Sequence, residues 1–147
     1  MGGRARSDVI LLDTNVLSAL MLRTPDRTVV EWLDEQPAES VWTTSITVFE
    51  VRMGIELLAK GRRRTRLEQE LDRLLAEELD GRVQPFDRSA ALAAGTIAAA
   101  RQRAGRTVEI RDVQIAGLAT ARRASLATGN TRHFEGLGVP LIDPWRG

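Results

Sequence analysis

The chain of 147 residues contains no cysteine, and only 4% of its residues are aromatic. The absence of cysteine excludes disulfide bonds, thiol catalysis and zinc sites with cysteine ligands. Lysine occurs once, as Lys60, beside a large excess of arginine, so a mechanism that needs a catalytic lysine has a single candidate. The net charge of +1 excludes a uniformly basic protein that coats nucleic acid through charge alone.

Long hydrophobic runs are also missing from the sequence. The first apolar run covers residues 9–12 and stops at Asp13. It is far shorter than the roughly 20 apolar residues of a membrane span. It is also shorter than the apolar core of a signal peptide, about 7–15 residues. We therefore expect a cytoplasmic protein that does not enter a membrane. The length is that of one domain, so we expect a single domain over residues 1–147, with residues 1–7 as a flexible N-terminal extension.

What the sequence does contain is an alternation of short apolar segments with longer amphipathic ones. The expected strands lie at residues 9–12, 41–43, 83–86, 126–128 and 139–142. The expected helices lie at residues 13–22, 28–35, 45–60, 67–79, 89–105 and 112–124. This alternation predicts an α/β fold of three layers, α/β/α, around a mostly parallel central sheet. The many alanines of residues 89–105 predict close packing of that helix.

Three acidic residues stand in apolar surroundings. Asp13 directly follows the first strand, at the edge of a parallel sheet where ligands bind. Glu50 falls within the apolar stripe that helix 45–60 is expected to turn inward, made of Ile46, Phe49, Met53 and Leu57. Asp112 is expected to begin a helix whose inner face carries Ile115 and Ala116. These are the candidate catalytic residues.

A divalent cation would explain carboxylates in such places. A buried carboxylate is costly unless it is paired, protonated or bound to metal. Mg²⁺ or Mn²⁺ binds oxygen ligands and suits phosphodiester hydrolysis, where the ion activates water and neutralises phosphate charge. Two alternatives stay open: Asp13 and Asp112 could cap helix N-termini, and Glu50 could pair with one of the arginines.

Four segments resemble the motifs of a known family: ILLDTNV at 10–16, SITVFEVRMG at 45–54, RDVQIA at 111–116 and TGNTRHF at 128–134. Together they are similar to PIN domains, in particular to toxins of the VapC/FitB type, over about residues 8–145. The resemblance implies a PIN fold with the acids gathered at the carboxyl ends of the strands. It also implies a Mg²⁺- or Mn²⁺-dependent endoribonuclease of a type II toxin–antitoxin module. Such a toxin typically forms a homodimer and is inhibited by a small antitoxin with a DNA-binding domain.

The resemblance also implies roles for individual residues. Asp13, Glu50 and Asp112 match the metal-binding acids. Polar residues near the site are Thr14, Asn15, Ser45 and Asn130. Many members carry an aspartate where Asn130 stands, and because an amide brings no negative charge we expect a weaker second metal position or a single metal.

Basic and apolar surfaces give further expectations. Arg52 and the arginines of the connection after residue 60, Arg62, Arg63 and Arg64, are candidate contacts for RNA phosphate. The leucine-striped helix 67–79 and the patch at 55–58 are candidate interfaces for a second copy or an antitoxin. His133, the single histidine, is expected near the site or on the surface rather than as a general base.

Two other functions are considered. One is a PIN scaffold with little or no activity that binds protein or RNA. The other is a phosphatase of the haloacid-dehalogenase type, which normally has a second aspartate where this chain has Asn15, and a lysine near the site. The arginine-rich composition disfavours the phosphatase.

Overall fold

The computed structural model describes residues 8–146, so the extension expected at residues 1–7 lies outside the described residues. The strands are β1 (Ile10–Leu12), β2 (Val41–Thr44), β3 (Val83–Gln84), β4 (Ser125–Ala127) and β5 (Leu141–Ile142). The helices are α1 (Thr14–Leu20), α2 (Arg27–Asp34), α3 (Ser45–Glu56), α4 (Arg62–Arg73), α5 (Arg88–Arg103), α6 (Ile110–Arg122) and α7 (Thr131–Phe134). Two single turns complete the list, the 3-10 turn Ala38–Ser40 and the π turn Leu74–Glu78.

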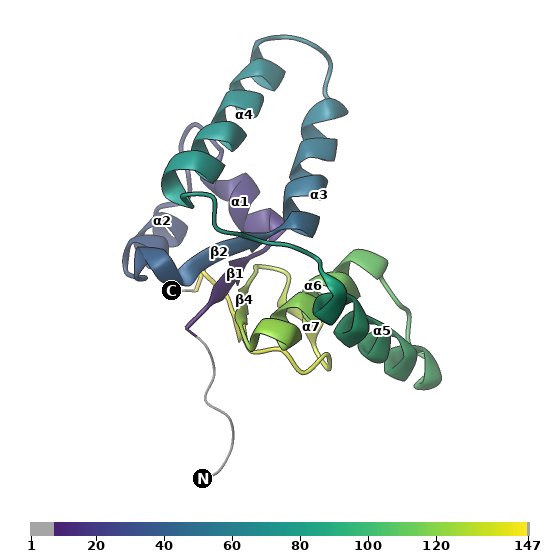
Figure 1. Ribbon diagram of the computed structural model, residues 1–147. Coiled ribbons are helices and arrows are strands. Elements are labelled where there is room, and N and C mark those ends of the chain that lie inside the picture. Colours follow the sequence, from purple (N-terminus) through teal and green to yellow (C-terminus); the bar gives the residue numbers. More distant parts are fainter. Residues whose placement is uncertain (1–7, 147) are drawn as a thin grey trace.

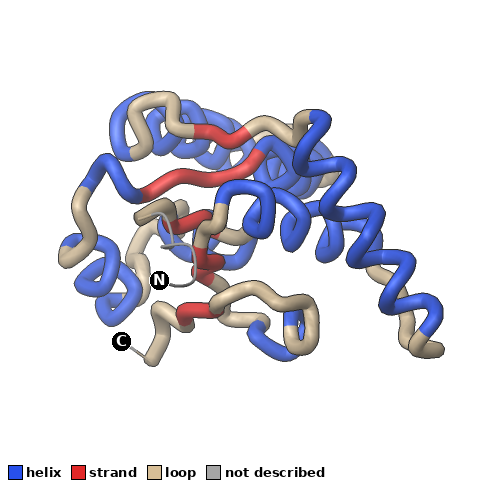
Figure 2. Tube along the Cα trace, turned by 60° about the horizontal axis from the view of Figure 1, so that its bottom comes forward, coloured by secondary structure: helices blue, strands red, loops and turns tan. Residues whose placement is uncertain are grey.

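The five strands form one parallel sheet in the order β3-β2-β1-β4-β5, drawn in red in Figure 2. The first strand is central, since Leu12 pairs with Thr43 of β2 on one side and with Ala127 of β4 on the other. The carboxyl ends of β1, β2 and β4 therefore meet at one edge of the sheet.

Alternating side chains of the strands build a core on each face of the sheet. Leu12 and Ala127 belong to the cluster covered by α1, α2, α3 and α4, whereas Leu11 and Leu126 belong to the cluster covered by α5, α6 and α7. Figure 1 shows these two groups of helices on opposite sides of the strands. The predicted three-layer α/β/α fold with a parallel sheet is confirmed.

Close packing of the alanine-rich helix is also confirmed. Ala90 and Ala94 of α5 are buried against α6 at Gly117. A Cβ atom at position 117 would lie 2.6 Å from the Ala94 Cβ and 2.7 Å from the Ala90 carbonyl oxygen. Only glycine leaves room for this approach of two helices.

The face of α3 that points inward differs from the prediction. Phe49, Met53 and Leu57 are 56%, 37% and 79% exposed, so their prediction as core residues is wrong. The buried stripe is Thr47, Val51 and Ile55, while Ile46 packs against the core beneath α5 and α6. Two adjacent apolar stripes at helical spacing run along this segment, and periodicity alone cannot choose between them. The helix also ends at Glu56, before residue 60.

The arginine run is helical rather than a connection. Helix α4 begins at Arg62, five residues earlier than predicted. Arg64 forms ion pairs with Glu56 and Glu68, which links the start of α4 to the end of α3. The leucines expected to form an external stripe are instead buried in the core: Leu71, Leu74 and Leu79 are each at most 3% exposed. The predicted interface along 67–79 is therefore wrong for these leucines, and Ile55 of the neighbouring patch is buried as well.

Among residues 8–146, no helix is both long and apolar enough to cross a membrane.

Candidate active site

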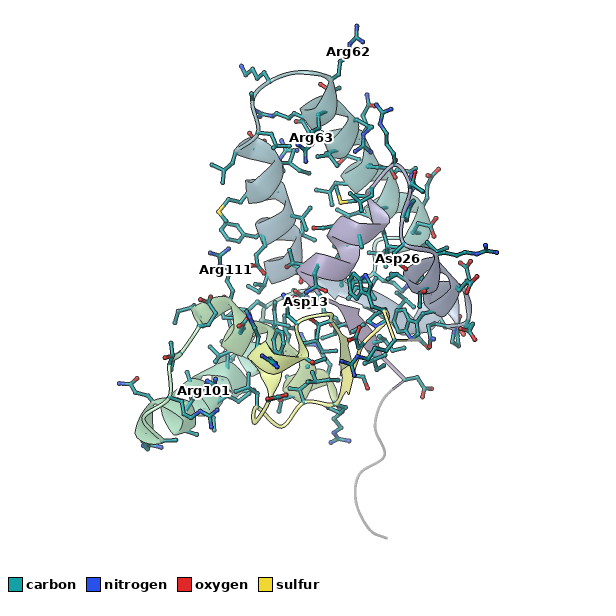
Figure 3. All side chains as sticks on the ribbon, turned by 180° about the vertical axis from the view of Figure 1, so that it is seen from behind. Asp13, Asp26, Arg62, Arg63, Arg101 and Arg111 are labelled. Carbon is teal, nitrogen blue, oxygen red and sulfur yellow. The ribbon has the colours of Figure 1, made fainter. Side chains whose placement is uncertain are left out.

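The candidate site lies where the central strands end. Asp13 follows β1, Ser45 follows β2 and Thr128 follows β4. Figure 3 shows Asp13 between the two groups of helices, at the junction of the layers. The fold therefore brings Asp13 to the carboxyl edge of the sheet, as the sequence predicts.

Asp13 is fixed by a network of hydrogen bonds. Its Oδ2 atom accepts hydrogen bonds from Thr128 Oγ1 at 2.8 Å and from Asn15 Nδ2 at 3.2 Å. Asn15 is oriented in turn by the Gly129 backbone N–H, which donates to Asn15 Oδ1 at 2.8 Å. Asp13 is 5% exposed and occupies the N-cap position of α1, but its carboxylate makes no capping hydrogen bond, so the alternative that it serves only as a helix cap is wrong.

Thr128 is a residue of the candidate site that reasoning from sequence did not single out. It is fully buried, and its hydroxyl also accepts hydrogen bonds from Asn15 Nδ2 and from the Asn130 backbone N–H. The available signal was its place at the end of an apolar strand that pairs with β1. Asn130 thus takes part through its backbone, next to the carboxylate of Asp13.

Asp112 lies in the first turn of α6, near Asp13. Helix α6 begins at Ile110 and Glu109 caps it, so the capping alternative for Asp112 is wrong too. His133 Nδ1 lies 3.3 Å from Asp112 Oδ2, which places the single histidine of the described chain beside the site.

Burial raises the pKa of both aspartates. For Asp13 the loss of water dominates, and the hydrogen bonds from Thr128, the Thr14 backbone and Asn15 oppose it. For Asp112 burial is again the largest cause of the raised pKa; His133 opposes it, and the negative charges of Glu109 and Asp13 add to it. The two aspartates therefore repel each other in a partly dehydrated space.

Glu50 is held by two partners on opposite sides. Thr14 Oγ1 donates to Glu50 Oε1 at 2.9 Å, and Arg111 Nη1 lies 3.3 Å from Glu50 Oε2. The Arg111 guanidinium carbon is in turn 5.9 Å from the centre of the Phe49 ring. The alternative that Glu50 pairs with an arginine is therefore correct, and Arg111 is a second residue near the acids that the sequence did not single out.

The donor set suits a hard divalent cation in part. Two dehydrated and mutually repelling carboxylates, Asp13 and Asp112, offer the oxygen ligands that Mg²⁺ and Mn²⁺ prefer. One carboxylate oxygen of Glu50 accepts a hydrogen bond from Thr14, the neighbour of Asp13, and the other accepts one from Arg111. Within residues 8–146 no three acidic or histidine side chains stand close enough to hold one ion together. The pair fits a cation, and Glu50 would join it only by turning from Arg111.

The remaining predicted residues contact other parts of the chain. Ser45 Oγ accepts a hydrogen bond from the Phe86 backbone N–H at 3.0 Å, which ties α3 to the chain after β3. Arg52 is paired with Glu56 and Glu68. Figure 3 shows Arg62 and Arg63 at the outer tip of the α3–α4 hairpin, away from Asp13.

Comparison with known proteins identifies the family of this chain. The family model described as "PIN domain" matches residues 10–138. VapC ribonuclease Y4jK of Sinorhizobium fredii is 37% identical over 93% of this chain and 98% of its own length. Toxin FitB of Neisseria gonorrhoeae is 34% identical over 93% and 99%.

Two solved structures share the fold. The FitAcB crystal structure, also from Neisseria gonorrhoeae, superposes with a TM-score of 0.84 at 33% identity and covers 95% of this chain and 100% of that one. DNA-bound VapBC from Salmonella typhimurium superposes with a TM-score of 0.80 at 28% identity, over 92% and 98%. The fold, the order of the motifs and these relatives agree: the chain belongs to the PIN domain family.

Proposed function

We propose that this chain is an endoribonuclease that hydrolyses RNA with Mg²⁺ or Mn²⁺, and that it acts as the toxin of a toxin–antitoxin module in the cytoplasm. The observation that carries the proposal is the pairing of Asp13 and Asp112. Both lie at the carboxyl edge of the sheet with pKa values raised by burial, in a PIN domain similar to a VapC ribonuclease.

The residues of this chain prepare the site in different ways. Thr128 and Asn15 fix the orientation of the Asp13 carboxylate, and His133 contacts the outer oxygen of Asp112. Thr14 holds Glu50 at the rim of the site. A bound divalent cation supplies an activated water and neutralises charge on the scissile phosphate. Because Asn130 carries no charge, the aspartate pair favours a single cation.

Removal of the acids tests the proposal. We expect the purified protein, freed of any antitoxin, to cleave single-stranded RNA only with Mg²⁺ or Mn²⁺. Asp13→Ala and Glu50→Ala should each abolish cleavage, by at least 10²-fold if they remove charge stabilisation in the transition state. Asp26→Ala, which removes an exposed acid that caps α2, serves as the matched control.

A PIN scaffold without activity remains the second candidate, favoured by Asn130 and by the ion pair of Glu50 with Arg111. Calorimetric titration with Mn²⁺ separates the two functions. A protein that bound no divalent cation and cut none of a broad RNA panel would be a binding module.

We further propose an antitoxin as partner, as the names of the relatives suggest. A groove of about 360 Å³ runs between α1, α3 and α4 and is mostly apolar. It is lined by Met21, Val51, Ile55, Leu58 and Leu67, among others, with Glu50 and Arg63 also at its wall. An antitoxin segment with apolar side chains would fit it and reach the acids. Co-expression with the product of the adjacent upstream gene should give a stable complex, and the absence of one would contradict the module.

A homodimer is the third part of the proposal. The exposed stripe Phe49, Met53 and Leu57 along α3 offers an apolar face of the kind that marks an interface. As a candidate interface, this stripe takes the place of the α4 leucines, because those leucines are buried in the core. A second copy of this chain is the occupant we propose for this stripe, next to the acids of the site.

A further inference from the structure

Arg111 stands apart from the other arginines of the described chain because it alone forms an ion pair with one of the three acids of the site. It immediately precedes Asp112 in α6, and its side chain contacts Glu50 of α3. Figure 3 shows Arg111 reaching from the lower group of helices toward the foot of α3. The guanidinium thus links the two layers at the mouth of the site.

The hydrogen bonds of Arg111 leave most of its donors unused. Its guanidinium has five N–H donors, and within residues 8–146 it donates one hydrogen bond, to Glu50 at 3.3 Å. The side chain is 39% exposed. Arg122 shows the opposite pattern: it donates to Gln84, Ser89 and the Pro85 carbonyl, pairs with Asp87, and is 17% exposed. Arg122 therefore ties the fold together, whereas Arg111 keeps donors for a ligand.

Phe49 lies beside the Arg111 guanidinium and helps to hold it in place. The ring lies 5.9 Å from the guanidinium carbon, a distance at which a cation is attracted to an aromatic face. Phe49 is 56% exposed, so the pair sits on the surface rather than in the core.

The charge around the site explains why a cationic side chain is needed there. Asp13, Glu50, Glu109 and Asp112 bring negative charge to the site, and negative charge repels a phosphodiester. Cationic side chains near Asp112 counter part of it, since Arg101 and Arg132 line the same pocket as this aspartate. An arginine binds phosphate through two parallel hydrogen bonds, which also fixes the orientation of the phosphate. Arg111 is placed to do this within contact distance of an acid of the site.

We propose that Arg111 is an RNA phosphate-binding residue that rests on Glu50 until RNA arrives. The inference rests on the proposed function. When the guanidinium turns to a phosphate, Glu50 loses its only ion-pair partner within the described chain and becomes free to join Asp13 and Asp112. Before that, Arg111 competes with a divalent cation for Glu50. Substrate and cation therefore bind in support of each other, and Arg111 couples them.

Two binding measurements test this without relying on cleavage. The first is the affinity for a short single-stranded RNA in EDTA, followed by fluorescence anisotropy. The second is the affinity for Mn²⁺ alone, followed by calorimetry. Variants are Arg111→Ala and Arg111→Lys, with Arg27→Ala as the matched control, since Arg27 is 91% exposed and forms an ion pair with Glu31 at the surface. Light scattering on each variant checks that the oligomeric state is unchanged.

We expect Arg111→Ala to weaken RNA binding about tenfold, more than Arg27→Ala does, and to tighten Mn²⁺ binding about fivefold because the competing cation is gone. Arg111→Lys should restore part of the RNA affinity, since it keeps the charge but loses the paired donors. An Arg111→Ala variant that binds Mn²⁺ more weakly, or RNA as well as Arg27→Ala does, would overturn the inference.

Failure of the proposed function looks different. A wild-type protein that binds RNA but never cuts it would refute the nuclease, and the RNA affinities of the Arg111 variants would still decide the inference. A wild-type protein that does not bind RNA at all would refute both.

Discussion

Replacing Asp13 by asparagine should stabilise the metal-free protein at neutral pH. The carboxylate is 5% exposed and pairs with no arginine or lysine in residues 8–146. The asparagine carbonyl can still accept the hydrogen bonds of Thr128 and Asn15. The substitution therefore removes mainly the cost of burying a charge, offset in part by a weaker hydrogen bond from the Thr14 backbone. We expect the free energy of unfolding to rise by about 1 kcal/mol, a usual size for a stabilising substitution. This corresponds to about 2–4 °C in Tm for a domain of this size.

The pH dependence gives the sign of this effect. Because folding raises the pKa of Asp13, the folded protein binds a proton more readily than the unfolded chain. The cost of the charge is therefore absent below the ordinary aspartate pKa of about 3.9 and grows as the pH rises through the raised pKa. Asp87 and Glu70, whose pKa values are lowered, give the opposite slope in both proteins and cancel in the difference.

The assay is urea denaturation of wild type and Asp13→Asn in EDTA, at about pH 4 and about pH 7.5. The difference should be near zero at the lower pH and about 1 kcal/mol in favour of the variant at the higher pH. Added Mn²⁺ should stabilise wild type more than the variant. Asp13→Ala, which removes the acceptor of the Thr128 hydroxyl proton, should lose about 1–3 kcal/mol. An Asp13→Asn variant less stable than wild type at pH 7.5 in EDTA would refute the reasoning.

Three further substitutions test separate contacts. Thr14→Val removes the hydrogen bond to Glu50 Oε1 and should lower RNA cleavage about 10-fold to 100-fold, with Thr14→Ser restoring it; equal rates would contradict a positioning role. Gly117→Ala should cost about 1–3 kcal/mol in denaturation, because its Cβ would clash with Ala94, whereas Gly95→Ala in the open surface of α5 should gain about 0.5–1 kcal/mol. Leu57→Arg should turn the dimer into a monomer in light scattering while Leu22→Arg, also exposed, leaves it intact; an unchanged dimer would place the interface elsewhere.

The sequence predicted those parts of the molecule in which chain direction determines position. Asp13 had to lie at the carboxyl edge of the sheet because it directly follows a buried strand, whereas the strand order could not be read from the sequence. The side chains around it were harder. Thr128 reaches Asp13 only because β4 pairs with β1, a pairing that no local pattern reveals.

Helix faces were the least predictable feature. On α3 two apolar stripes compete, and which one faces inward is decided by the approach of α1 and α4, not by spacing. The start of α4 was missed because a run of arginines after a glycine is typical of a loop as well as of a helix whose charges find partners, such as Glu56 and Glu68. The contact of Arg111 with Glu50 depends on both of these helix positions.

The two cores on opposite faces of the sheet have a consequence for how the protein loses activity. Glu50 belongs to a helix of one core and Asp112 to a helix of the other, and Asp13 directly follows strand β1 between them. A partial unfolding event that loosens only one layer would leave the other core intact and still separate the acids. The relative positions of the three acids therefore depend on both layers being folded at once. Mild heat or denaturant should abolish chemistry while much of the helical signal persists, so inactivation would precede unfolding as measured by circular dichroism.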